Sequence, residues 1–340
     1  MNLSDIDYEL PEKLIAQHPV EPRDSARLLV ATSPDQVEHK HVTDLVDMLE
    51  AGDVMVVNDT RVLPARLSLH RKTGGAAEVL LLEQRSSDFR LWEALVKPAS
   101  TLKPDEVLEY FGKRVVRVGP RTEAGDTFVV EILDENPMEL LQRIGAMPLP
   151  PYIRSTLTDL ERYQTVYARR MASAAAPTAG LHFSKIVMKK MELNGVQFSP
   201  ITLHVGLGTF RQVDVEDLTK HKTDSEHFII DETTCGFVNE ALDNKKHVLA
   251  IGTTVMKALE SSVSASGHLK PINSWTDKFI FPPYEFKIPT ALLTNFHLPE
   301  SILLMMTSAF GGYELVQEAY KQAIKEKYRF LTYGDAMLVI

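Results

Sequence analysis

Residues 147–151 read Met-Pro-Leu-Pro-Pro, and the chain changes character across this stretch. Proline fixes its own backbone and restricts the residue before it, so three prolines in five residues favour an extended hinge. Before the hinge the sequence runs in short β-like segments, and after it helical and strand-like segments alternate. The stretch therefore marks a domain boundary.

Six short segments before the hinge have a β-like pattern, and turn residues such as Gly74-Gly75 and Gly125-Asp126 separate them. Evenly spaced short strands of this kind are typical of a small barrel. The segments cover residues 66–70, 78–82, 91–96, 107–110, 114–118 and 128–133.

Residues 1–60 have a mixed pattern, as does the chain after the hinge. The first part contains strand-like runs at 27–31 and 54–57, a short helix near 11–16, and a helix at 44–49 behind the possible cap Thr43. Domain insertions succeed at exposed loops whose ends lie close together. The sequence therefore predicts an α/β main domain, residues 1–60 plus 148–340, with an inserted small β-barrel domain, residues 61–147.

The composition is that of an ordinary globular protein, with 44% hydrophobic and 24% charged residues among 340. A single cysteine, Cys235, excludes an internal disulfide framework and multi-cysteine zinc sites. The first residues are acidic where a signal peptide is basic, and no apolar run approaches the length of a membrane helix. We therefore expect a cytoplasmic protein with no membrane partner. The net charge of -9 argues against nonspecific nucleic-acid binding over the whole surface but allows a local basic face.

Residues 174–183 read Ala-Ala-Ala-Pro-Thr-Ala-Gly-Leu-His-Phe, a run of small residues that ends on a histidine and an aromatic ring. A helix is predicted directly after it, at 184–193, with Ser184 as its N-cap and Gly195 at its end. Such a loop at a helix N-terminus lets a carboxylate or phosphate approach backbone N–H groups. The alternative is a structural loop in which His182 bonds a neighbouring carbonyl.

Two later segments also join a strand to a loop that suits a ligand. A strand enters the glycine loop 206–208, which lacks the third glycine of a dinucleotide fingerprint. A second strand, at 247–251, turns through Gly252 into a helix at 255–261. Thr253 and Thr254 lie where an N-cap or a ligand contact belongs.

A third segment, Thr294 to Pro299, leads into an apolar helix at 302–309. Asn295 and His297 are polar groups that suit a pocket edge. Taken as a single residue, His297 is better explained as a half-buried structural histidine whose hydrogen bonds are satisfied. The final segment, 314–328, is rich in Lys and Glu and predicts a solvated helix.

Seven long and unusual segments lie in order along almost the whole chain. They are NDTRVLPAR (58–66), MPLPPYI (147–153), YQTVYA (163–168), AAPTAGLHF (175–183), LHVGLGTF (203–210), TNFHLP (294–299) and YGDAM (333–337). Together they closely resemble the signature segments of the S-adenosylmethionine:tRNA ribosyltransferase-isomerase family of queuosine biosynthesis. The chain differs at Ala172-Ser173-Ala174-Ala175, where Gly-Ser-Val-Ala is expected, and at Thr223-Asp224, where a Met-His pair is usual.

The resemblance implies an enzyme that uses S-adenosylmethionine as a ribosyl donor. Such an enzyme transfers the ribosyl moiety to the aminomethyl group of 7-aminomethyl-7-deazaguanine at the tRNA wobble position. It isomerises the ribosyl group to an epoxycyclopentane and releases adenine and methionine, leaving epoxyqueuosine in the tRNA. The expected partner is therefore the tRNA anticodon loop, the expected protein is a monomer, and no metal is required.

Candidate site residues follow from the resemblance combined with side-chain chemistry. The candidates for proton transfer are His182, His204 and Glu226. The candidates for the cofactor pocket are Pro177, Thr178, Ala179, Gly180, Leu181, Phe183, Gly206, Gly208, Thr209, Phe210, Thr253, Thr254, Asn295 and His297. The candidates for contacts with tRNA are Arg61, Arg66, Tyr152, Arg154, Tyr163 and Tyr167.

Two other functions are compatible with the residues taken alone. One is a noncatalytic RNA-binding module whose barrel recognises RNA, and release of adenine on mixing with precursor tRNA would exclude it. The other is an ordinary methyltransferase, which would form S-adenosylhomocysteine. The absence of a glycine-rich first strand-turn counts against the methyltransferase.

Overall fold

The computed structural model describes residues 3–123, 125–157, 159–206, 215, 218, 221 and 223–340. The chain divides into two compact units. The α/β unit comprises Met1–Thr60, Pro150–Arg170 and Ala176–Ile340, and the barrel unit comprises Arg61–Leu149 and Met171–Ala175. The sequence-based division ends the insertion at 147 and leaves 171–175 with the α/β part.

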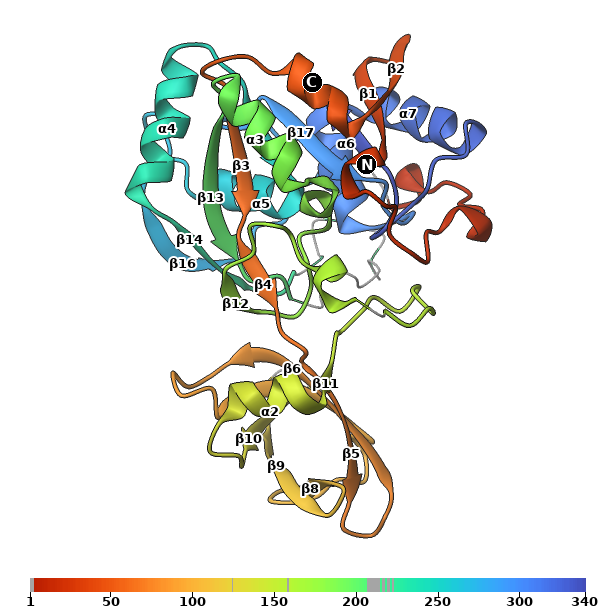
Figure 1. Ribbon diagram of the computed structural model, residues 1–340, viewed down its shortest axis with the longest axis vertical. Coiled ribbons are helices and arrows are strands. Elements are labelled where there is room, and N and C mark those ends of the chain that lie inside the picture. The colour runs from red at the N-terminus through yellow and green to blue at the C-terminus, as the bar shows by residue number, and fades with distance from the viewer. Residues whose placement is uncertain are drawn as a thin grey trace. The chain divides into compact units, whose positions relative to one another are not determined.

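In the described part of the barrel unit, six antiparallel strands close into a barrel in the order β5-β6-β7-β10-β9-β8, and β8 pairs back to β5 (Figure 1). The prediction of an inserted small β-barrel is confirmed. The strands are β5 Arg66–Arg71, β6 Ala76–Gln84, β7 Leu91–Lys97, β8 Val107–Tyr110, β9 Lys113–Arg121 and β10 Phe128–Ile132.

Every second side chain of a barrel strand points inward, and these side chains fill the barrel. In β7, Trp92, Ala94 and Val96 are buried while their neighbours are more exposed. This period of two places one face of each strand in the interior. The helix α2, Pro137–Ile144, and the short strand β11, Gly145–Ala146, follow the barrel strands and were not predicted.

In the described part of the α/β unit, nine strands form a mixed sheet in the order β16-β14-β13-β3-β15-β17-β18-β1-β2. The central strands β3, β15 and β17 are buried along their whole length, as expected for parallel strands covered on both faces. The strands are β1 Arg27–Ser33, β2 Gln36–His41, β3 Val54–Asn58, β13 Gln197–Leu203, β14 Glu226–Ile230, β15 Val248–Ile251, β16 Ile272–Thr276, β17 Ala291–Asn295 and β18 Ala336–Val339. A separate pair joins β4 Thr60–Val62 to β12 Arg170–Ser173.

The strands β13, β3, β15 and β17 are parallel to one another. Their carboxyl ends therefore lie at one edge of the sheet, which we call the carboxyl edge. The strand β18 is antiparallel to β17, so Gly334 and Asp335, which precede β18, lie at the same edge.

Helices cover both faces of the sheet (Figure 1). Leu28 and Val30 of β1 pack in a cluster with Val187 and Met191 of α3. The alternate β1 residues, Leu29 and Ala31, pack in a cluster with residues of α6 and α7 on the opposite face. The helices are η1 Leu3–Ile6, η2 Glu12–Leu14, η3 Arg23–Ser25, η4 Val42–Asp44, α1 Leu45–Met48, η5 Leu160–Tyr163, η6 Thr178–His182, α3 Lys185–Leu193, α4 Glu232–Asp243, α5 Thr253–Ser261, α6 Ile302–Gly311 and α7 Tyr313–Lys325. None of the described helices is long and apolar enough to cross a membrane.

Capping residues and local patterns in the sequence predicted some helices correctly and others only in part. Ser184 caps α3 as predicted, because its Oγ accepts a hydrogen bond from Val187 N at 3.2 Å. Thr43 does not cap the next helix, since His41 and Asp44 form the capping box there instead. The helix predicted near residue 11 is the single 3-10 turn η2.

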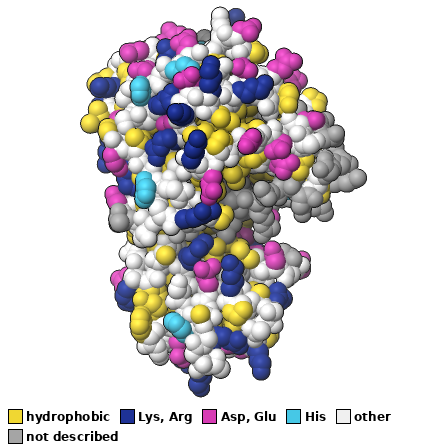
Figure 2. All heavy atoms as spheres, turned by 90° about the vertical axis from the view of Figure 1, so that its right-hand side faces the viewer, with side chains coloured by type: hydrophobic (Ala, Val, Ile, Leu, Met, Phe, Trp, Pro, Cys, Tyr) yellow, Lys and Arg dark blue, Asp and Glu magenta, His cyan; other side chains and the backbone are white. Residues whose placement is uncertain are grey.

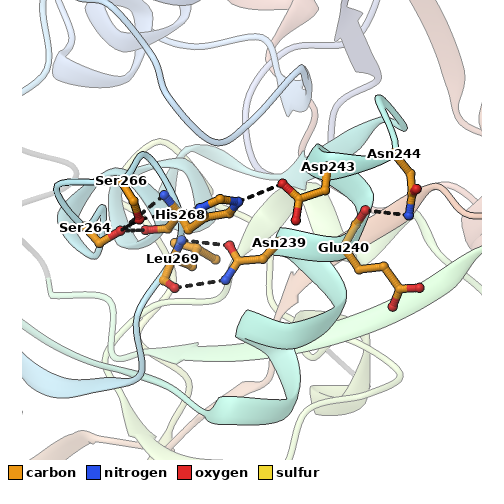
Figure 3. Close-up of polar contacts among 8 residues, drawn as sticks. All are labelled: Asn239, Glu240, Asp243, Asn244, Ser264, Ser266, His268 and Leu269. Atoms are coloured by element: carbon orange, nitrogen blue, oxygen red, sulfur yellow. Dashed lines mark hydrogen bonds and ion pairs between the residues drawn. The ribbon is translucent and has the colours of Figure 1, made fainter.

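One surface turn, residues 263–269, is tied to α4 by side chains (Figure 3). The Asn239 amide donates to Leu269 O at 3.0 Å and accepts from Leu269 N at 2.8 Å. His268 Nε2 lies 2.9 Å from Asp243 Oδ1, an exposed pair. The Asn239 amide therefore satisfies both backbone polar groups of a buried residue, whereas the ion pair remains hydrated.

We predict that Asn239→Ala lowers the free energy of unfolding by about 1–3 kcal/mol, because it leaves the buried Leu269 N–H and C=O without partners. Urea denaturation measures this loss. The control His268→Ala breaks the exposed ion pair and should cost less than about 1 kcal/mol. Equal losses for the two variants would contradict this account of the turn.

Candidate active site

The carboxyl edge collects four polar segments that are far apart in the sequence. Asp59 and Thr60 follow β3, His204 follows β13, Thr253 follows β15, and Asn295 ends β17. In open α/β sheets, ligands bind outside the carboxyl ends of the strands. The parallel pairing therefore brings together several of the loops that the sequence singled out.

The loop that contains η6 lies against this edge. The Thr178 hydroxyl donates to Asn295 Oδ1 at 2.9 Å. A Cβ built on Gly252 would lie 3.5 Å from the Ala179 Cβ. Gly252 has a φ of +93°, a conformation that favours glycine, and it is the N-cap of α5. The η6 loop and the β15–α5 turn are thus in direct proximity.

The tight packing of this loop requires Gly180. A Cβ at this position would lie 2.1 Å from the Tyr167 hydroxyl oxygen, which is closer than any real contact. The Tyr167 hydroxyl is buried and has no hydrogen-bond partner among the described residues. Burial also raises the pKa of this phenol. Tyr167, predicted as an RNA contact, therefore lies beside the predicted cofactor loop.

His182 has the structural role that was the alternative in the sequence analysis, because its ring bonds backbone carbonyls. Its Nδ1 lies 3.0 Å from Ala179 O and its Nε2 lies 3.0 Å from Gly334 O. Burial lowers the pKa of His182, and the two carbonyls oppose that shift. Because both ring nitrogens face backbone acceptors, neither is directed at a substrate. Leu181 and Phe183, from the same loop, are buried in the core.

His204 is placed differently, with one ring nitrogen held by a side chain. Its Nδ1 lies 2.9 Å from the Thr60 hydroxyl. Burial lowers the pKa of His204 to about 4, and nearby His227 adds to the effect while Asp59 opposes it. The imidazole is therefore neutral at pH 7 and can accept a proton.

Asp59, which the sequence analysis did not select, is the buried carboxylate at this edge, with 2% of its surface exposed. One oxygen accepts from the Thr202 hydroxyl at 2.6 Å, and the other lies 3.0 Å from the Arg169 guanidinium. A buried carboxylate needs such partners to remain charged. The sequence feature that could have identified Asp59 is its position directly after a fully buried strand.

Glu226 lies on the other face of the sheet. Its Oε1 accepts from Gly206 N at 3.0 Å, and its Oε2 lies 3.0 Å from Lys257 Nζ of α5. His227, the next residue of β14, stacks on His204, and adjacent strand residues point to opposite faces. The predicted proton-transfer residues His204 and Glu226 therefore do not share a face. Lys257 was missed, although it is the one basic residue of α5, a helix whose other charged residue is Glu260.

Of the remaining pocket candidates at the carboxyl edge, Thr253, Asn295 and His297 are buried and Thr254 is half-buried. The Thr254 hydroxyl has no partner among the described residues, and Thr253 is 5% exposed. His297 Nε2 lies 2.8 Å from the Thr294 hydroxyl, and burial lowers the pKa of His297 to about 3. Asn295 also donates to Leu331 O. Gly208, Thr209 and Phe210 lie outside the described residues.

The RNA candidates have varied surroundings. Arg154 is exposed and lies 3.0 Å from Glu12, and the Tyr152 hydroxyl lies 2.8 Å from that of Thr332. Tyr163 is fully buried, so its ring presents no face to a base in this conformation. Arg61 and Arg66 belong to the barrel unit.

The distribution of charge differs between the two units. The barrel unit contains thirteen Lys and Arg and thirteen Asp and Glu residues, so the whole net charge of -9 resides in the α/β unit. On the face drawn in Figure 2, Lys and Arg side chains are interspersed with Asp and Glu. In the part of the chain that the structure describes, no three His, Cys, Asp or Glu residues gather as a metal site.

Comparisons with known proteins agree over the full length. The sequence model of a family described as "Queuosine biosynthesis protein" matches residues 3–339. Proteins named S-adenosylmethionine:tRNA ribosyltransferase-isomerase are similar to the chain: the one from Cytophaga hutchinsonii is 52% identical and that from Flavobacterium psychrophilum 47%, each covering 100% of both chains. A crystal structure of S-adenosylmethionine tRNA ribosyltransferase from Thermotoga maritima is 32% identical with a TM-score of 0.56, and it covers 99% of this chain and 100% of its own.

We predict that stability falls as pH drops from about 6.5 to 4, because folded His204, with a pKa of about 4, resists a proton that the unfolded chain accepts near 6.5. His204→Gln should remove about 1–3 kcal/mol of the difference in unfolding free energy between pH 7 and pH 4. Urea titrations at the two values measure it. The matched variant His70→Gln, at an exposed barrel position, should leave that difference unchanged. The same slope in all three proteins would refute the assignment.

Proposed function

The chain belongs to the queuosine biosynthesis family and is an enzyme, and from this premise we propose that it is an S-adenosylmethionine:tRNA ribosyltransferase-isomerase. It transfers and isomerises the ribosyl moiety of S-adenosylmethionine onto 7-aminomethyl-7-deazaguanine at the tRNA wobble position. The products are epoxyqueuosine-tRNA, adenine and methionine. The observation that carries this proposal is the match of the entire chain to relatives with that name.

The η6 loop and the β15–α5 turn are the best candidates for the S-adenosylmethionine site. Three features support them: the positive φ of Gly252, and the buried hydroxyls of Thr254 and Tyr167, which lack partners among the described residues. A buried hydroxyl without a partner is costly, and a polar ligand can satisfy it. The donor would bring its sulfonium, which acidifies the adjacent C–H bond and makes the ribosyl group reactive.

Among the candidates for proton transfer, His204 has the most suitable placement. It is neutral at pH 7, Thr60 fixes one nitrogen, and the Asp59 carboxylate favours its protonated form. A histidine with so low a pKa is a weak base, so the acidity of the carbon beside the sulfonium must supply part of the driving force. Thr60 orients His204, the Asp59 carboxylate acts on it electrostatically, and neither residue needs to move a proton.

We assign positioning roles to the other two candidates. His182 joins the η6 loop to the start of β18 through the carbonyls of Ala179 and Gly334. Glu226 joins Lys257 to the backbone of Gly206, at the start of the glycine loop. Both residues hold chain segments that contain pocket candidates. Replacement of His182 or Glu226 should therefore disturb the site indirectly, by changing how these segments fold.

The barrel unit would contact the RNA through Arg61 and Arg66, and Arg154 and Tyr152 are the candidates for RNA contacts in the α/β unit. The balanced charge of the barrel unit, in a chain with net charge -9, makes it the less repulsive unit for a polyanion. In this account the chain acts as a monomer in the cytoplasm, where tRNA is modified, and the insertion at 61–147 adapts an α/β catalytic domain to tRNA.

We predict that the enzyme releases adenine and methionine in equal amounts when it is mixed with S-adenosylmethionine and tRNA carrying 7-aminomethyl-7-deazaguanine. Chromatography of the small molecules and mass spectrometry of the tRNA measure both products. His204→Ala should lower kcat by about 10²–10⁴-fold, because a general acid or base contributes a factor of this size.

The matched control is His39→Ala, since His39 lies in β2, the edge strand at the opposite end of the sheet from β14. It should retain most of the wild-type rate. Formation of S-adenosylhomocysteine without adenine would identify a methyltransferase and overturn the proposed function. A His204→Ala variant with more than a third of the wild-type kcat would remove His204 from proton transfer while leaving the function intact.

A further inference from the structure

Three aromatic rings form a ladder on one face of the α/β unit: His204, which follows β13, His227 of β14 and Trp275 of β16. His204 stacks on His227, with ring centroids 5.8 Å apart and an angle of 18° between the planes. His227 in turn contacts Trp275, at 5.2 Å and 56°. His227 and Trp275 are directly paired across β14 and β16. The ladder thus runs from the candidate base His204 to the outermost strand β16.

Burial decreases along this ladder. His204 is half-buried, whereas Trp275 exposes 47% of its surface. The other tryptophan of the sequence, Trp92, is 1% exposed in the barrel. A large ring that is 47% exposed forgoes about half of the free energy that full burial would provide. Among the described residues, cross-strand packing with His227 accounts for one side of Trp275, and 47% of its surface is exposed.

The middle ring is held in a fixed orientation. His227 Nε2 lies 2.7 Å from Asn273 Oδ1, an oxygen that only accepts, so the hydrogen resides on Nε2. Asn273 belongs to the same strand and the same face as Trp275. A ring fixed in this way provides a rigid support for its neighbour.

Positive charge lies next to the inner end of the ladder. The Arg170 guanidinium is close enough to His204 to disfavour protonation of the ring. Arg169 is exposed and held by Asp59 at 3.0 Å. Aromatic rings beside arginines are the combination that proteins use for unpaired RNA bases and their phosphates. A stable protein partner would need roughly 1,000 Å² of complementary surface, for which one exposed ring is too little.

We infer that the ladder is a stacking site for an unpaired purine or pyrimidine base of the RNA substrate, with Trp275 as the outer platform. This inference rests on the proposed function for the identity of the RNA. Stacking on Trp275 is a contact that involves no net charge, which suits an acidic unit that must hold a polyanion. The stacked base would lie at the end of a continuous series of rings that begins at His204.

The two tryptophans permit a direct test by fluorescence. In a Trp92→Phe background, Trp275 is the only tryptophan, and stacking of a base should quench its emission on titration with an anticodon stem-loop RNA. Trp275→Ala, in the otherwise unchanged enzyme, should raise KM for the RNA about tenfold, since stacking contributes about 1–3 kcal/mol per base. KM for S-adenosylmethionine should stay within about twofold. Trp275→Phe should restore most of the RNA affinity.

The control variant is Phe237→Ala, because Phe237 is a partly exposed ring on α4, outside the ladder. It should change KM for RNA less than twofold. Where Trp92→Phe disturbs the barrel, 5-fluorotryptophan in the otherwise unchanged enzyme gives two ¹⁹F resonances. The Trp275→Phe variant assigns them, and the RNA should shift the Trp275 signal.

The possible outcomes distinguish failure of the ladder proposal from failure of the proposed function. Unchanged emission and an unchanged ¹⁹F signal at saturating RNA, in an enzyme that still releases adenine, would overturn the ladder and leave the function in place. Quenching without any release of adenine would support the ladder as an RNA site and contradict the proposed function. Equal KM changes for Trp275→Ala and Phe237→Ala would also overturn the ladder.

Discussion

The parallel hydrogen-bond ladder that joins β13, β3, β15 and β17 is the constraint on which the site depends. Because these strands run in one direction, the residues that follow each of them meet at one edge. Asp59, His204 and Asn295 are far apart in the sequence, and only this pairing brings them to a common edge. The η6 loop then closes on that edge through the contact of Thr178 with Asn295.

Buried charges at this edge have local partners, and this pairing fixes the geometry. Asp59 is held by Thr202 and Arg169, and Glu226 by Lys257 and the Gly206 amide. Breaking one member of such a pair leaves an uncompensated buried charge, which typically costs about 3–5 kcal/mol. These partners therefore favour one arrangement of the charged side chains at the edge. A preorganised site of this kind spends less of its binding energy on ordering its own side chains.

Local patterns in the sequence predicted those elements whose signals are local. The strand at 107–110 and the helix capped by Ser184 both depend on neighbouring residues, and both are confirmed. The helix α2 was missed although Asn136 and Pro137 are a helix-start signal, because it has only eight residues and directly follows the last barrel strand. Side-chain roles depend on distant partners, so they were harder to predict. His182 was selected for its loop, yet its environment comes from Gly334, 152 positions away.

The same reason explains the residues that sequence analysis overlooked. Asp59 and Lys257 acquire their importance from partners on other strands and helices, which spacing along the chain does not reveal. Tyr163 was chosen as an aromatic ring that could stack on an unpaired base, but the fold buries it completely. Family resemblance supplied the order of the segments and the chemistry. The structure shows which side chains face one another.

Hydrogen exchange of the full-length enzyme with and without S-adenosylmethionine tests the central claim, which is that the donor binds at the carboxyl edge of the sheet. Backbone amides in the η6 loop at 178–183 and in the β15–α5 turn at 252–256 should exchange more slowly with the ligand, because bound polar groups protect N–H donors. The barrel strands should show no change. Binding that is detected by calorimetry, with protection confined to the barrel strands and none at 178–183 or 252–256, would contradict the account.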